Sequence, residues 1–100
     1  GGIEGDWELF TCYDRSNSGC FIIIKDGIIK NASGERYPDF FKCEYELLDD
    51  NKIRAFNCSG SNKKGKSGIW ERLNKGTGYS LYSPSGAMYI PSVGFSGYTF

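Results

Sequence analysis

This 100-residue sequence lacks histidine altogether. Without an imidazole, Ser-His-Asp and Cys-His catalytic arrangements are excluded, and so is every zinc site with a histidine ligand. Long apolar runs are also missing: the longest, residues 21–24, is far short of the ~20 residues that a membrane-spanning helix needs. Neither sign of charge dominates, because 12 basic residues balance 12 acidic ones. We therefore expect no nucleic-acid partner, no membrane span, no metal and no cofactor.

What the sequence does contain is glycine (14 residues) and aromatics (16%), a mixture typical of tight turns between pleated strands. Short apolar–polar runs recur at spacings of about ten residues, with turn residues between them. This pattern predicts an all-β fold: a small antiparallel meander of about eight strands that forms a barrel, with a β-sandwich as the alternative. We expect a single domain over residues 1–100, with residues 91–100 as an irregular tail rich in glycine, serine and aromatics.

Two segments test this prediction most directly. Asp26-Gly27 lies between two β-branched runs and matches a type I′ hairpin turn, in which both central residues need positive φ. Residues 40–48 alternate apolar and polar side chains, which favours a strand. The same residues also fit a helix, with Asp39 as its N-cap, and this alternative stays open.

Four cysteines in a short chain favour a disulfide framework and an oxidising, extracytoplasmic compartment. The alternatives are a four-thiolate zinc site, which usually has closer spacings, and free buried thiols. Of three possible pairings we prefer the two that close local loops, Cys12–Cys20 and Cys43–Cys58. A turn centred on Asp50-Asn51 would place Cys43 opposite Cys58, whereas a one-residue slip would put the thiols on opposite faces. The opening Gly-Gly-Ile indicates a mature or trimmed form.

Three short motifs are interpreted as coincidental or structural. Residues 60–67 satisfy the phosphate-loop pattern G-x-x-x-x-G-K-[ST], but no long amphipathic helix follows, so we expect a polar hairpin loop. Glu44 and Glu46 share one face of the strand predicted there and are expected to be solvated rather than catalytic. Asn31 and Asn57 begin glycosylation sequons, which matter only in a eukaryotic secretory host.

Aromatic residues crowd the last quarter of the chain. In a small β domain most of them belong to the core, yet so many among Ser, Gly and Pro also suggest an exposed binding surface. The candidate binding residues are Tyr79, Tyr82, Tyr89, Phe95 and Tyr98.

Gly5-Asp6-Trp7 at the start of the first predicted strand, followed by a meander of hairpins, resembles the calycin superfamily of lipocalins, avidins and small bacterial protease-inhibitor barrels. The resemblance implies that Trp7 plugs one end of the barrel and that an arginine packs across it, for which Arg72 is the candidate. Bacterial metalloprotease inhibitors of this type insert an N-terminal segment into the enzyme, but only six residues precede Trp7 here.

These observations lead to one expectation and three alternatives. We expect a non-catalytic binding module, secreted or periplasmic, that recognises a protein or glycan through its surface, with protease inhibition as one form of this role. The first alternative is a small-molecule carrier of calycin type, although strands this short suggest an interior filled by side chains. The others are a hydrolase that uses carboxylates, and an assembly role in which the aromatic tail adds a strand to a neighbouring sheet.

Overall fold

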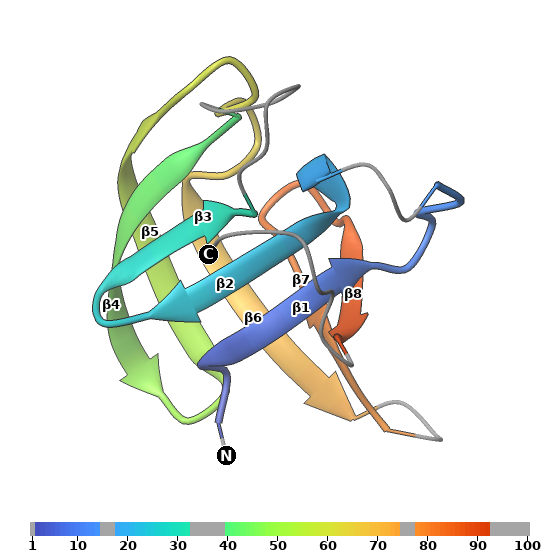
Figure 1. Ribbon diagram of the computed structural model, residues 1–100. Coiled ribbons are helices and arrows are strands. Elements are labelled where there is room, and N and C mark those ends of the chain that lie inside the picture. The colour runs from blue at the N-terminus through green and yellow to red at the C-terminus, as the bar shows by residue number, and fades with distance from the viewer. Residues whose placement is uncertain (1, 15–17, 33–39, 75–77, 93–100) are drawn as a thin grey trace.

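The computed structural model describes residues 2–14, 18–32, 40–74 and 78–92, which form eight antiparallel strands and one 3₁₀ turn (Figure 1). The elements in order are β1 (Gly5–Leu9), η1 (Ser18–Cys20), β2 (Phe21–Lys25), β3 (Ile28–Asn31), β4 (Lys42–Asp49), β5 (Lys52–Ser59), β6 (Gly68–Asn74), β7 (Tyr79–Tyr82) and β8 (Met88–Pro91).

Each strand pairs with the next along the chain, and β8 pairs with β1, so the sheet closes on itself as a barrel. The predicted meander barrel is confirmed. The sandwich alternative is wrong, and so is the helical alternative for residues 40–48, because β4 occupies this segment. The hairpin between β2 and β3 has the predicted turn, with φ of 53° at Asp26 and 81° at Gly27.

Two boundaries differ from those that the sequence predicts. The apolar–polar pattern predicts a first strand from Trp7 to about Tyr13, but β1 ends at Leu9, because the chain turns there and the Cys12 N–H donates to the Leu9 carbonyl oxygen at 3.0 Å. At the other end, Pro91 belongs to β8 and lies opposite Trp7, so the strand extends one residue into the predicted tail. Residues 93–100 lie outside the described residues.

The core fills the interior of the barrel. Side chains along each strand alternate between the inside and the outside of the barrel, and the inward-facing ones form the core. Trp70 of β6 and Leu81 of β7 are fully buried there, as are Ile22 and Ile24 of β2. The complete cluster comprises Ile3, Trp7, Ile22, Ile24, Ile29, Phe41, Cys43, Tyr45, Ile53, Ala55, Trp70, Leu81 and Tyr89.

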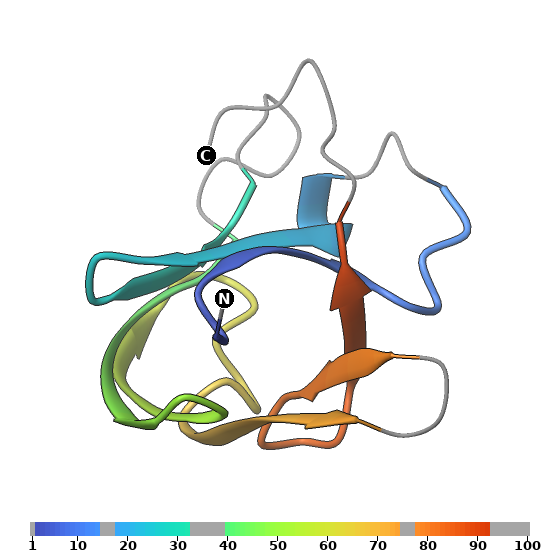
Figure 2. The same ribbon diagram turned by 90° about the horizontal axis from the view of Figure 1, so that it is seen from below.

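The segment before β1 folds back across one end of the barrel, where the ring of strands surrounds it in Figure 2. Ile3 is fully buried, and its carbonyl oxygen accepts a hydrogen bond from Trp7 Nε1 at 2.8 Å. Arg72 Nη1 donates to the Gly2 carbonyl oxygen at 3.1 Å, and its Nε donates to Asn51 Oδ1 at 2.9 Å. Arg72 thus fixes the segment that precedes Trp7, whereas the packing of an arginine across the Trp7 ring, which the calycin resemblance implies, stays a prediction.

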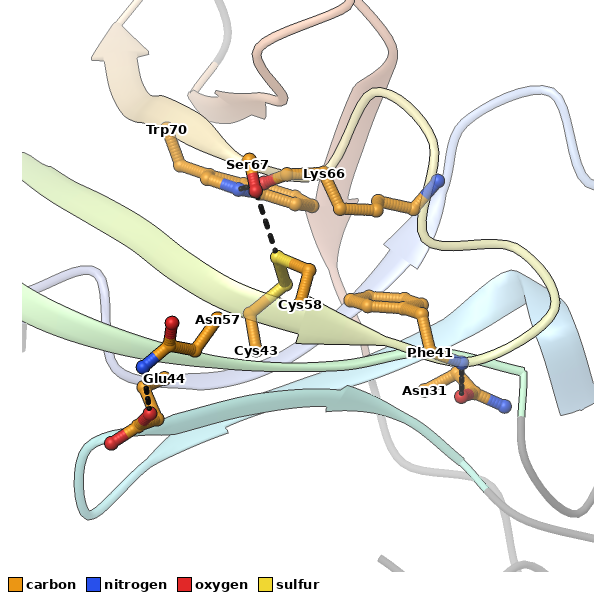
Figure 3. Close-up of a disulfide and its surroundings, with 9 residues drawn as sticks. All are labelled: Asn31, Phe41, Cys43, Glu44, Asn57, Cys58, Lys66, Ser67 and Trp70. Atoms are coloured by element: carbon orange, nitrogen blue, oxygen red, sulfur yellow. Dashed lines mark hydrogen bonds between the residues drawn. A yellow bond between two sulfur atoms is a disulfide. The ribbon is translucent and has the colours of Figure 1, made fainter.

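Both preferred disulfides are present, Cys12–Cys20 and Cys43–Cys58, and they account for all four cysteines. The second joins β4 to β5, and its sulfurs lie between the two strands and Ser67, whose hydroxyl donates to Cys58 Sγ at 3.3 Å (Figure 3). The zinc and free-thiol alternatives are therefore wrong.

The register between β4 and β5 is less simple than the sequence predicted. Asp49 lies opposite Lys52, as a turn centred on residues 50–51 requires, but the register then shifts by one residue at Leu48. A second shift of opposite sense at Asn57 restores the original register, so that Cys43 lies opposite Cys58. Because the two bulges have opposite sense and cancel each other, no net slip remains at the cysteines, and the predicted Cys43–Cys58 pairing is confirmed.

The second bulge depends on Asn57, which adopts φ of 51° and donates from Nδ2 to Glu44 Oε2 at 2.7 Å. Asparagine tolerates this left-handed conformation better than other residues with a Cβ, except aspartate, and glycine tolerates it freely. We expect Asn57→Val to lower the free energy of unfolding by about 1–3 kcal/mol, because a β-branched side chain is strained there. Asn57→Gly should cost less. Urea unfolding of both variants checks this, and equal losses would contradict a backbone origin.

Candidate functional site

The structure divides the predicted aromatic binding residues among different environments. Phe95 and Tyr98 lie outside the described residues. Tyr79, Tyr82 and Tyr89 belong to β7 and β8, where successive side chains point to opposite faces of the sheet. Tyr79 shares its face of β7 with the core residue Leu81, whereas Tyr82 points outward, so these two tyrosines do not form one surface.

Tyr89 is a core residue, and its assignment to an exposed binding surface is wrong. It is only 4% exposed, and its ring centroid lies 5.6 Å from that of Trp70. Burial raises the pKa of Tyr89 to about 12, because the phenolate would lose its hydration inside the barrel.

Tyr79 is 45% exposed, but its ring makes a structural contact at one end of the barrel. The guanidinium of Arg72 lies 4.1 Å from the Tyr79 ring centroid, a cation–π contact. Because Arg72 also holds Gly2 and Asn51, Tyr79 covers one face of a structural arginine.

Tyr82, a predicted binding residue, lies on the outer face of the barrel beside two residues that the sequence pattern did not indicate, Met88 and Phe10. Met88 lies opposite Tyr82 on β8, and the Tyr82 hydroxyl donates to Met88 Sδ at 3.4 Å. Next to them, the N–H of Phe10 donates to the Met88 carbonyl oxygen at 2.9 Å, and the Phe10 side chain is 59% exposed. We call these three residues, Tyr82, Met88 and Phe10, the aromatic face. Phe10 is exposed, whereas Tyr82 and Met88 are partly buried. Exposed aromatic side chains are typical of interfaces.

A second outward surface lies on β2, β3 and β4. A hollow of about 280 Å³ opens to solvent there, lined by Ile23, Lys25, Asp26, Ile28, Lys30 and Lys42. We call these residues the lysine face. Two further hollows flank it, one of about 450 Å³ toward Glu4 and Asp6 and one of about 300 Å³ toward Glu44 and Asn57.

The acidic pair considered for a hydrolase is engaged in structural contacts. Glu46 forms an ion pair with Arg54 on the neighbouring strand, and Glu44 accepts the hydrogen bond from Asn57. Both carboxylates lie on the exposed face of β4. Across the described residues, no three side chains of His, Cys, Asp or Glu are arranged to hold a metal ion.

Residues 60–67, which match the phosphate-loop pattern, connect β5 to β6. They lead into a strand, as predicted, since Gly68 begins β6. Lys66, the residue that would contact a phosphate, lies over the Phe41 ring at 5.2 Å from its centroid (Figure 3). Burial lowers the pKa of Lys66. The segment closes a hairpin and lacks the helix that a phosphate site requires.

The two sequons also differ in their environment. Asn31 is buried, its Nδ2 donates to the Ala32 carbonyl oxygen at 2.7 Å, and its Oδ1 accepts from the Phe41 N–H at 2.9 Å. A glycan on this amide is incompatible with the fold. Asn57 is exposed.

No protein-family model, curated protein or solved structure matches this chain. Among the described residues there is no helix with the length and apolarity to cross a bilayer. The eight-stranded antiparallel meander is consistent with the calycin-like fold that the sequence resembles, and the two disulfides are typical of proteins from oxidising compartments.

Proposed function

We propose that this protein is a non-catalytic binding module, secreted or periplasmic, that recognises a protein or glycan partner through the outer surface of its barrel. The observation that carries the proposal is the packed interior, because large side chains such as Trp70, Trp7 and Tyr89 occupy the space that a carrier would need for its ligand. A partner must then contact the outside.

The aromatic face is the surface that best supports this role. Phe10 and Tyr82 offer apolar area with few rotatable bonds, and Tyr82 adds a polar tip. Tyr13, near Phe10 in the sequence, is also fully exposed.

Contacts within the barrel argue against two alternatives: protease inhibition by an inserted N-terminal segment, and strand addition to a second copy. Ile3 is buried in the barrel end, so insertion of the N-terminal segment into a protease cleft would require this plug to leave the core. If the protein inhibits a protease, the aromatic face is the better candidate for the contact. Strand addition to a second copy is disfavoured because β1 and β8 pair with each other, so the described strands leave no free outer edge.

The test is a binding screen with defined probes: an array of purified neutral and acidic glycans, a set of purified secreted proteases with fluorogenic substrates, and the neutral apolar dye N-phenyl-1-naphthylamine. For any glycan or protease that binds, we expect the double variant Phe10→Ser/Tyr82→Ser to weaken binding about 30-fold or more, since central aromatic contacts are worth about 2 kcal/mol or more. Surface plasmon resonance measures the change.

The matched control is Phe56→Ser/Ile69→Ser, which removes two exposed apolar side chains from β5 and β6. It should leave the affinity within about twofold, as substitutions outside a contact surface usually do. Stoichiometric binding of the neutral dye, without binding to any glycan or protease, would instead support the carrier alternative.

A further inference from the structure

The lysine face contains an arrangement that folding alone does not explain. Lys30 of β3 and Lys42 of β4 are direct cross-strand partners. Directly opposed residues on an antiparallel pair have Cβ atoms about 4.5–5.5 Å apart, and like charges in this position destabilise the sheet. A third lysine, Lys25, lines the same hollow.

Within the described residues no ion pair joins Lys30 or Lys42 to a carboxylate, and Asp6 of β1, on the same outer face, is separated from Lys30 by Ile23. The ion pairs seen there are Lys52–Glu71 and Glu46–Arg54, both on other parts of the barrel. Glu44 lies near the hollow, but its carboxylate accepts the hydrogen bond from Asn57. Asp26 lines the hollow at the β2–β3 turn, on the far side of Ile28 from Lys42.

The remaining lining residues are apolar. Ile23 lies opposite Lys30 and Ile28 lies opposite Lys25, so the two isoleucines are diagonal neighbours between the lysines. Both are partly exposed to solvent although they are aliphatic. The hollow therefore combines an apolar floor with two ammonium groups at one end.

We propose that the lysine face binds an amphiphilic organic anion: a single carboxylate, sulfate or phosphate group between Lys30 and Lys42, with an aliphatic portion on Ile23 and Ile28. One oxyanion accepts charge-assisted hydrogen bonds from both ammonium groups and removes their repulsion. This site is separate from the aromatic face and does not depend on the proposed function.

The shape of the site favours this ligand over a larger anionic partner. Its volume, about 280 Å³, is near the lower end of small-molecule pockets. A sulfated glycan would place hydrated sugars on two isoleucines, which costs the burial of polar groups without partners. A bilayer surface is flat and would not reach the floor of a hollow.

The experiment is an NMR titration of the ¹⁵N-labelled protein with octyl sulfate below its micelle concentration, with octanol and inorganic sulfate as separate ligands. Octyl sulfate should give saturable shifts at the backbone amides of Ile23, Ile28, Lys30 and Lys42. Octanol and inorganic sulfate should each bind at least tenfold more weakly, because each supplies one half of the required chemistry.

Lys30→Gln/Lys42→Gln should weaken octyl sulfate binding at least tenfold. The control Lys63→Gln/Lys64→Gln removes the same charge from two exposed lysines of the β5–β6 connection and should change the affinity less than twofold. A second variant separates binding from folding: Lys42→Glu should raise the urea midpoint of the free protein, since it replaces repulsion with attraction, and yet abolish binding.

Several results would overturn the proposal. Equal affinity for inorganic sulfate would mean a simple anion site, and equal losses in the two lysine pairs would mean a non-specific effect of charge. Binding to heparin or to phosphatidylglycerol vesicles without binding to monomeric octyl sulfate would assign the face to a glycan or a membrane. None of these results bears on partner binding by the aromatic face, which the Phe10 and Tyr82 variants test separately.

Discussion

Replacing Trp70 with alanine should lower the free energy of unfolding by about 3–5 kcal/mol, a large share of the ~5–15 kcal/mol that stabilises a typical domain. Trp70 is fully buried in the barrel, and its ring packs against Tyr89. The substitution also removes the donor to the Lys66 carbonyl oxygen, which Trp70 Nε1 contacts at 2.8 Å. Urea unfolding followed by tyrosine fluorescence and circular dichroism measures the loss.

The control is the neighbouring residue, Ile69, whose side chain points outward and is 43% exposed. Ile69→Ala should change stability by about 0.5 kcal/mol or less, as is usual for surface positions. If the two variants lost similar amounts of stability, the alternation of inward and outward residues along β6 would be wrong.

Gly60→Ala should be about as damaging, with a loss of about 3–5 kcal/mol from left-handed backbone strain and steric overlap together. Gly60 follows β5 with φ of 107°, and a Cβ there would lie 2.6 Å from the Phe40 carbonyl oxygen and 2.7 Å from Phe41 Cα. Both obstacles are backbone atoms, so a rotamer change cannot relieve the overlap. Thermal and urea unfolding of the purified variant, or its failure to accumulate as folded protein, reports the effect.

Gly86 provides the matched comparison because it shares the positive φ, 92°, but a methyl group added to it would meet no atom of the described residues within 4 Å. Gly86→Ala should therefore cost only the conformational strain, about 1–2 kcal/mol. If Gly60→Ala were no less stable than Gly86→Ala, the backbone at Phe40 would have to move away from the added methyl group at little cost in free energy.

The fold was predictable where a local pattern determines it. Asp26-Gly27 determines a hairpin through the φ values it permits, and the turn at residues 50–51 sets the start of the β4–β5 register. The pair of bulges was not predictable, because the shift at Leu48 and its reversal at Asn57 each depend on how the closed barrel curves. The correct disulfide Cys43–Cys58 was thus inferred from a register that is interrupted between the turn and the cysteines.

The candidate site was predicted less well, because composition does not give side-chain direction. Counting aromatics gathered Tyr79, Tyr82 and Tyr89 into one group, although alternation along β7 and β8 separates them. Phe10 was missed because it follows β1 and meets Met88 only when the first and last strands pair.

The lysine face illustrates the same limit. The Asp26-Gly27 turn places Ile23 opposite Lys30, and this pairing could have been read from the sequence. The approach of Lys42 to Lys30 could not, because the chain between β3 and β4 has no turn signal that fixes the register.

Closure of the barrel by β1 and β8 has a consequence for synthesis of the protein. The two strands that close the barrel, β1 and β8, come from opposite ends of the described chain. Their pairing therefore has the greatest loop-closure entropy cost of any strand pair, and we expect it to form late in folding. On the ribosome, the first strand must wait until the last has emerged before it gains its second neighbour. Until then the nascent sheet has two unpaired margins, and this is the period in which a chaperone would be of most use.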